Sequence, residues 1–206
     1  SKTMINFSSI ANIPRIIFNP KLLQPSLTYQ NFNEINFELL KTKHSIKYIV
    51  LDKDNCISAD KSSRVYPLYL QNNWNNGLLK HFPLKNILIV SNSMGSSDDP
   101  GFAQVHQFQK NYQQDANISA VLPILEHNYK KPGCQASIID HFQKTDPENT
   151  VKPENIAVIG DRLFTDILMA NQMKSLGVYL QQGVALKKSS PWIMLEQGIY
   201  KCFFSN

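Results

Sequence analysis

Apolar and polar positions follow two patterns from residue 46 onward. Short continuous apolar runs, typical of buried strands, are separated by longer stretches in which apolar residues recur every three or four positions, typical of helices. The strand-like runs are 46–52, 86–92, a weaker one at 119–125, 155–161 and 176–180. The helix-like stretches are 66–82, 101–112, 133–144, 163–173 and 191–204. This alternation predicts an α/β fold, with helices on both faces of a parallel sheet.

The first 45 residues have a different pattern and are expected to form an N-terminal arm outside the core, in front of a domain at residues 46–206. Three prolines interrupt this segment, and no Asp or Glu precedes Glu34. Apolar residues interleaved with Lys and Arg are typical of a segment that lies on an anionic bilayer. The arm is therefore a candidate membrane-surface anchor, with packing over the domain surface as the alternative.

Length and charge limit the classes of function. A chain of 206 residues suits one domain with one core. The net charge of +5 favours anionic partners such as phospholipid, nucleic acid or phosphorylated metabolites. Three cysteines without a CxxC pair indicate neither a disulfide framework nor a zinc site. No apolar run approaches the roughly 18 to 20 residues that cross a bilayer, so membrane contact is expected from one face only.

Polar residues close the strand-like runs, and in a parallel sheet the ligand site lies beyond the carboxyl ends of the strands. In chain order they are Asp52 and Asp54, Ser91 and Asn92, then Lys130 and Lys131 before Pro132, and finally Asp161 and Asp166. Each alone has an ordinary explanation as a turn or helix-cap residue. As an ordered set over residues 46–180, they resemble the haloacid dehalogenase (HAD) superfamily of phosphatases.

The resemblance implies a Rossmann-like parallel sheet and a phosphoryl-transfer site. Asp52 would be the nucleophile that forms an aspartyl-phosphate intermediate. Asp54, two positions along an extended strand, points to the same side and would protonate the leaving oxygen and then deprotonate water. Ser91 would bind the transferring phosphoryl oxygens, and Lys131 would neutralise their charge.

The same resemblance implies Mg²⁺ as the cofactor, a hard cation that prefers oxygen ligands and relieves the repulsion between neighbouring carboxylates. Asp52 and Asp161 would hold the ion through their side chains, and Asp54 through its backbone carbonyl. Asp166 would support the metal or orient Lys131. Its alternative role is that of a first-turn acid beside a helix dipole.

Three further residues are candidates for substrate binding: Asn92, Lys130 and Arg162. The alternative for Lys130 is a solvated neighbour of Lys131, and the alternative for Arg162 is a surface ion pair. Lys53 should face the opposite side of the strand, so we assign it no catalytic role. The five histidines lack metal-ligand spacing and are expected to be structural or surface residues.

No separate cap domain is expected, because the segments 54–91 and 91–131 have room for little beyond one helix each. Superfamily members without a cap leave the phosphate site open to bulky substrates. The segments VLDKDNCI, LIVSNSMGS, KKPGC and VIGDRLFTDILMAN are similar to the mitochondrial phosphatidylglycerophosphate phosphatases of fungi.

That closer resemblance implies Mg²⁺-dependent removal of the terminal phosphate from phosphatidylglycerophosphate. The product would be phosphatidylglycerol, on the route to cardiolipin. The enzyme would act as a peripheral protein at the matrix face of the mitochondrial inner membrane. Its partners would be an anionic phospholipid and the membrane surface, and not nucleic acid.

Two alternatives remain open. One is a capless HAD phosphatase that acts on protein, nucleic-acid ends or sugar phosphates. The other is a non-enzymatic receiver-like domain, which also uses Asp, Ser or Thr, Lys-Pro and Mg²⁺ on a parallel sheet. The order of residues argues against a receiver, because there the acid pair precedes the phosphorylated Asp and Lys-Pro lies on the last strand.

Overall fold

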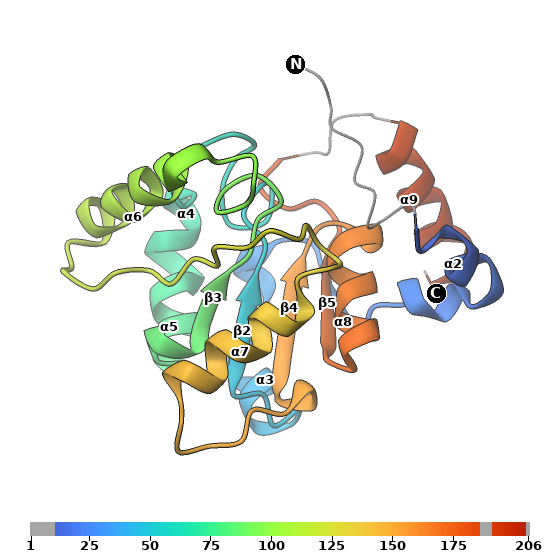
Figure 1. The fold of residues 1–206 in the computed structure, drawn as a ribbon, viewed down its shortest axis with the longest axis horizontal. Helices are drawn as coiled ribbons and strands as arrows, with labels where there is room; N and C mark the ends of the chain where they lie inside the picture. The colour runs from blue at the N-terminus through green and yellow to red at the C-terminus, as the bar shows by residue number, and fades with distance from the viewer. Residues whose placement is uncertain (1–10, 186–190, 205–206) are drawn as a thin grey trace.

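Five parallel strands form the centre of the molecule, which is represented by a computed structural model that describes residues 11–185 and 191–204 (Figure 1). The strands are β1 (Leu27–Tyr29), β2 (Tyr48–Leu51), β3 (Ile87–Ile89), β4 (Ile156–Gly160) and β5 (Leu176–Leu180). Their order across the sheet is β1-β5-β4-β2-β3, and every pairing is parallel. The α/β prediction is confirmed.

Helices cover both faces of the sheet because successive strand residues point to opposite sides. In β2, Ile49 and Leu51 enter one apolar cluster, whereas Tyr48 and Val50 enter another. The first face carries α3 (Phe37–Thr42), the continuous helical stretch α4 (Pro67–Tyr69), η3 (Leu70–Leu78) and α5 (Leu79–His81), and α6 (Ala103–Ala116). The second carries α7 (Gln135–Thr145), in front of the sheet in Figure 1, and α8 (Leu168–Met173), which continues η7 (Leu163–Ile167).

The weak strand expected at 119–125 forms only a single bridge, between Ile89 and Ile124. Ile89 N donates to Pro123 O at 2.9 Å, and Leu125 N donates to Ile89 O at 2.9 Å. A proline has no N–H to extend a ladder, which limits the run to this one contact.

The first 45 residues differ from the expected arm. β1 pairs with β5 at the edge of the sheet, and Leu23, Phe32 and Phe37 are buried. The segment from Leu23 onward thus belongs to the core, although a strand of three residues is too short to leave an alternating pattern in the sequence. The preceding helix α2 (Ile13–Phe18) lies beside α9 (Pro191–Phe203), beyond the β5 side of the sheet (Figure 1). The anchoring role stays a prediction, and residues 1–10 of the arm lie outside the described part.

Residues 52–134, all of which are described, contain no separate cap domain, as predicted. The remaining short helices are η1 (Pro20–Leu23), η2 (Phe32–Glu34), η4 (Leu84–Asn86), η5 (Pro100–Phe102) and η6 (Pro153–Asn155). Within the described ranges, every helix is too short or too polar to span a bilayer.

Candidate active site

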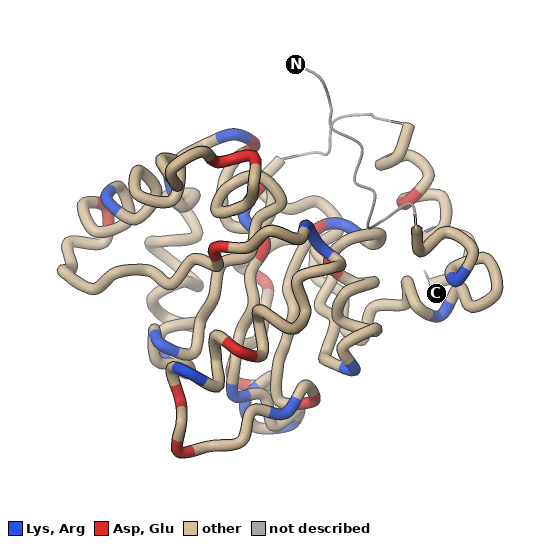
Figure 2. Tube along the Cα trace, in the orientation of Figure 1, with Lys and Arg blue, Asp and Glu red and all other residues tan. Residues whose placement is uncertain are grey.

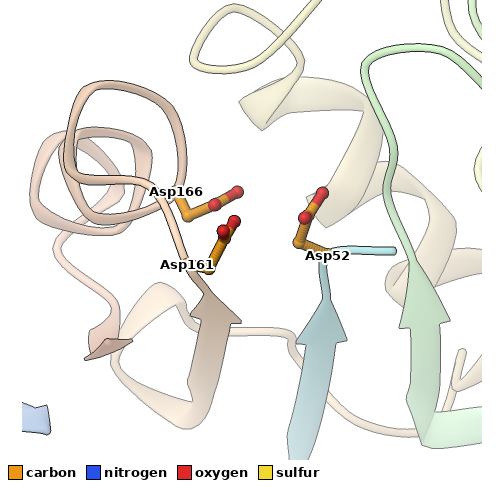
Figure 3. A group of neighbouring side chains, drawn as sticks. All are labelled: Asp52, Asp161 and Asp166. Carbon is orange, nitrogen blue, oxygen red and sulfur yellow. The ribbon is translucent and has the colours of Figure 1, made fainter. Parts of the chain in front are cut away.

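Three carboxylates meet at the carboxyl ends of the central strands. Asp52 follows β2, Asp161 follows β4, and Asp166 lies in η7. Each offers an oxygen atom within 4.8 Å of those of the other two, and Figure 3 shows the three side chains converging on one space. The adjacent parallel pairing of β2 and β4 brings Asp52 and Asp161 together, as the positions of the predicted acids implied.

Backbone and amide groups hold two of these acids in place. A Cβ atom on Gly160 would lie 2.2 Å from Cγ of Asp166, so the absence of a side chain there permits the close approach. Arg162 N donates to Asp166 Oδ2 at 3.2 Å. Asn55 Nδ2 donates to Asp161 Oδ2 at 3.1 Å.

Lys131 is the cation of the cluster. Its Nζ lies 2.5 Å from Asp52 Oδ1 and 2.5 Å from Asp166 Oδ1, and its side chain is 2% exposed. The structure therefore brings together four of the predicted residues: Asp52, Lys131, Asp161 and Asp166. The contact between Asp166 and Lys131 matches one of the three roles considered for Asp166, the orientation of Lys131.

Burial and mutual charge shift the titration of this group. Burial raises the pKa of Asp52 to about 6, with Asp166 and Asp54 adding to the rise and Lys131 opposing it. Burial also raises the pKa of Asp166. Burial opposes the charge of Lys131, but Asp166 and Asp52 outweigh it and hold the pKa of this ammonium above its usual range. The site thus keeps its ammonium charged and has carboxylates that gain from a further positive charge.

The donor set fits a divalent cation. With all three acids ionised, their charges and the single ammonium of Lys131 leave two negative charges to be balanced. All the donors are carboxylate oxygens. Hard divalent cations prefer oxygen ligands, whereas softer metals prefer nitrogen or sulfur ligands. The cluster is therefore a candidate metal centre.

Asp54 lies on a more open side of the site than Asp52. Its Oδ1 accepts a hydrogen bond from Lys61 N at 3.1 Å and forms an ion pair with Lys53. Its Oδ2 accepts from the hydroxyl of Ser93 at 3.3 Å. The side chain is 32% exposed, so a leaving group or water has access to it.

Ser91 and Asn92 organise the loops on either side of the site. Ser91 Oγ accepts hydrogen bonds from the backbone N–H groups of Ser93 and Met94, both at 3.2 Å. Asn92 Oδ1 accepts from Lys131 N at 2.7 Å, so this side chain positions the lysine backbone. Substrate contact by Asn92 stays a prediction.

The side chains of the two remaining predicted residues make ion pairs with acids that are not members of the cluster. Lys130 Nζ lies 2.5 Å from Asp98 Oδ2, with both side chains partly exposed. Arg162 Nε donates to Glu196 Oε2 at 2.7 Å, and the glutamate side chain is 1% exposed. An ion pair was the alternative considered for Arg162, and its partner lies inside the protein.

Sequence patterns missed four residues that support the site: Lys53, Asn55, His127 and Glu196. Lys53 is buried and reaches the carboxylate of Asp54, although we expected it to face away. His127 Nε2 lies 2.9 Å from Ser91 O, and its Nδ1 lies 2.7 Å from Tyr129 O, so this ring joins the serine to the loop that carries Lys131. Lys53 and Asn55 carried a local signal, as the positions between and directly after the two strand-end acids.

Comparisons with known proteins agree with the geometry. The sequence profile of the family described as "Mitochondrial PGP phosphatase" matches residues 7–185. The chain is 38% identical over 196 residues to the mitochondrial phosphatidylglycerophosphatase GEP4 of Saccharomyces cerevisiae, which covers 95% of this chain and 97% of that protein. It is 30% identical over 211 residues to the probable mitochondrial phosphatidylglycerophosphatase of Schizosaccharomyces pombe, covering 96% of this chain and 92% of the relative.

A plant protein is more distant. Phosphatidylglycerophosphate phosphatase 1, chloroplastic/mitochondrial, of Arabidopsis thaliana is 27% identical over 165 residues, which is 79% of this chain and 42% of that protein. No solved structure matches the chain. The profile match spans the strands, the acid cluster and Lys131, so the chain belongs to the mitochondrial PGP phosphatase family.

Proposed function

We propose that the protein removes the terminal phosphate of phosphatidylglycerophosphate, giving phosphatidylglycerol, through an aspartyl-phosphate on Asp52. The contact that carries this proposal is that of buried Lys131 with Asp52 inside a cluster of three acids. A buried ammonium beside a nucleophilic carboxylate is suited to a phosphoryl group, which brings negative charge to the same place. The names of the relatives support the lipid substrate.

Mg²⁺ is the proposed cofactor, held by the side chains of Asp52, Asp161 and Asp166 and by the backbone carbonyl of Asp54. When bound, it would neutralise charge on the phosphoryl oxygens and lower the repulsion between the phosphate and the nucleophile. The three acids and Lys131 leave two negative charges, which one divalent cation would balance, and this supports the assignment.

In the first step, a carboxylate oxygen of Asp52 attacks phosphorus and the bond from phosphorus to the glycerol oxygen breaks. Asp54 in its protonated form gives a proton to that leaving oxygen, which departs as the hydroxyl of phosphatidylglycerol. Lys131 and Ser91 hold the transferring phosphoryl oxygens. A single well-placed donor of this kind contributes about 3 to 4 kcal/mol to the transition state.

In the second step, water attacks the phosphorus of the aspartyl-phosphate. Asp54, now a carboxylate, takes a proton from this water, and the bond between phosphorus and the Asp52 oxygen breaks. Inorganic phosphate leaves, and both aspartates return to their starting forms. The partial exposure of Asp54 supports this double role, because both the leaving oxygen and the water must reach it.

Location at the matrix face of the mitochondrial inner membrane is part of the proposal. The relatives from both yeasts are named as mitochondrial proteins. A net charge of +5 suits an anionic membrane surface, and a site without a cap domain leaves room for a headgroup attached to a bilayer.

Phosphate release from phosphatidylglycerophosphate in mixed micelles, with Mg²⁺ or with EDTA, tests the proposal. We expect release only with Mg²⁺, and a rate well above that for glycerol phosphate, sugar phosphates, phosphopeptides or 5′-phosphorylated oligonucleotides at equal concentration. Equal or faster hydrolysis of any soluble substrate would refute the lipid assignment. Full activity in EDTA would refute the metal assignment.

A further inference from the structure

The C-terminal helix α9 buries its acidic side chain and exposes large apolar side chains. Its single acid, Glu196, faces inward and is 1% exposed. Three large apolar side chains face outward: Trp192, Met194 and Leu195 are 52%, 61% and 48% exposed. A helix that borders only water has the opposite arrangement, because burial of apolar area is favourable and burial of a charge is costly.

Helix α2 extends the same exposed apolar surface. Its Ile17 and Phe18 are 70% and 89% exposed. Ile16 of α2 is buried in an apolar cluster against which Ile199 and Tyr200 of α9 pack, so the two helices share one foundation. They lie beside each other at one end of the molecule (Figure 1). We call this surface, made by the outward side chains of α2 and α9, the α2/α9 surface.

The charges around this surface are positive. Arg15 lies in α2, Lys21 follows in η1, and Lys201 lies in α9, and all three are exposed. Figure 2 shows no acidic position along α2 and η1, and the single acid of α9 is the buried Glu196. Exposed apolar side chains bordered by lysine and arginine match the surface of an anionic bilayer.

Helix α9, which carries part of the α2/α9 surface, is hydrogen-bonded to a segment of the candidate active site. Glu196 accepts hydrogen bonds from Arg162 Nε at 2.7 Å and from Phe164 N at 3.1 Å. These two residues lie between Asp161 and Asp166 in the chain. A bilayer under the surface would therefore lie close to the loop that carries two of the three acids.

We propose that the α2/α9 surface lies on an anionic bilayer and presents the active site to lipid headgroups. This inference rests on the proposed function, since a lipid substrate reaches the site from a membrane. It adds the C-terminal helix to the membrane contact. It also assigns Glu196 a positioning role, because its hydrogen bonds to Arg162 and Phe164 fix α9 relative to the acid cluster.

The test compares the wild type with the double variant Trp192→Ser with Leu195→Ser, and with Phe18→Ser. A matched control is Leu68→Ser, since Leu68 is 53% exposed on α4, on the far side of the molecule. Binding is measured by co-sedimentation with vesicles of phosphatidylcholine alone or of phosphatidylcholine mixed with anionic phosphatidylglycerol. Hydrolysis of a soluble phosphoester and circular dichroism report on the fold.

We expect the double variant to bind anionic vesicles about tenfold more weakly or worse, because Trp192 and Leu195 each have about half of their surface left to bury, and the two together contribute about a factor of ten or more. Phe18→Ser should also weaken binding, whereas Leu68→Ser and the soluble-ester rates should stay at wild-type values. Unchanged vesicle binding in the double variant would overturn the proposal. So would a wild-type oligomer that the double variant breaks into monomers while vesicle binding persists, because the surface would then join copies of the chain.

The lipid substrate is tested separately. Wild-type protein that binds anionic vesicles but releases no phosphate from phosphatidylglycerophosphate would refute the proposed function and would still support the docking surface.

Discussion

Replacing Lys131 by methionine should destabilise the metal-free protein strongly. Methionine keeps most of the side-chain volume and removes only the charge, so Asp52 and Asp166 would stay buried beside Asp161 with no ammonium between them. Removal of one partner from a buried ion pair costs about 3 to 5 kcal/mol. For a protein of this size each kcal/mol lowers the melting temperature by about 2 to 4 °C, so we expect a decrease of about 6 to 20 °C.

This loss should depend on pH in a defined direction. Burial raises the pKa of both Asp52 and Asp166, and without Lys131 both pKa values rise further. A folded state with a raised carboxyl pKa binds protons more tightly than the unfolded chain, in which the pKa is about 4. The variant should therefore lose least stability near pH 5 and most near pH 7.5. Mg²⁺ should restore part of it, because the ion supplies the missing positive charge.

Thermal unfolding followed by circular dichroism at pH 5 and pH 7.5, in EDTA and in Mg²⁺, measures these effects. Lys130→Met is the matched control, since its partner Asp98 and Lys130 itself are both partly exposed, and such pairs contribute about 0 to 1 kcal/mol. Equal melting temperatures for the two variants in EDTA at pH 7.5 would refute the view that Lys131 compensates buried acids. The phosphatase rate should also fall about 10²- to 10³-fold in Lys131→Met and mildly in Lys130→Met.

The remaining predictions concern the carboxylates. Asp52→Asn and Asp54→Asn should each abolish turnover while melting temperature is kept or raised, and a near wild-type rate in either would contradict the roles assigned to them. Mg²⁺ affinity should rise with pH through about 6 and level off above it, since the raised pKa of Asp52 means that metal and proton compete there. Calorimetry should detect proton release near pH 6, and an affinity independent of pH between 5 and 7.5 would argue that Asp52 is not a ligand. Asp161→Asn should weaken Mg²⁺ binding at every pH.

The sequence was sufficient for the parts of the fold that follow from local periodicity. The apolar runs of β2, β3, β4 and β5 and their intervening helices were identified because each run is buried on both faces. β1 was missed because its three residues are half-buried and follow closely after Pro25. The acids at strand ends were found for a general reason, since parallel strands gather their carboxyl ends at one edge.

What the sequence could not reveal were the contacts between distant segments. Asn55 reaches Asp161 across 106 positions, and Glu196 reaches Arg162 across 34. Asn55 stands next to the strand-end acids, but neither its sequence neighbourhood nor that of Glu196 indicates the partner, which only the folded chain brings into contact. Lys53 was placed on the wrong side because strict alternation along a strand stops where β2 ends, at Leu51.

These distant contacts bear on how the site is kept in place. Asp52 follows a short, buried strand. Asp166 lies in the π-helix η7, which Arg162 precedes and which continues into α8. Lys131 contacts Asp166 of this segment, and the buried Glu196 of α9 accepts a hydrogen bond from Phe164 N of the same segment. A change in α9 would therefore reach the acid cluster through one buried glutamate. Helix α9, which we propose to contact the bilayer, thus also holds the segment 161–166, which carries two of the three acids.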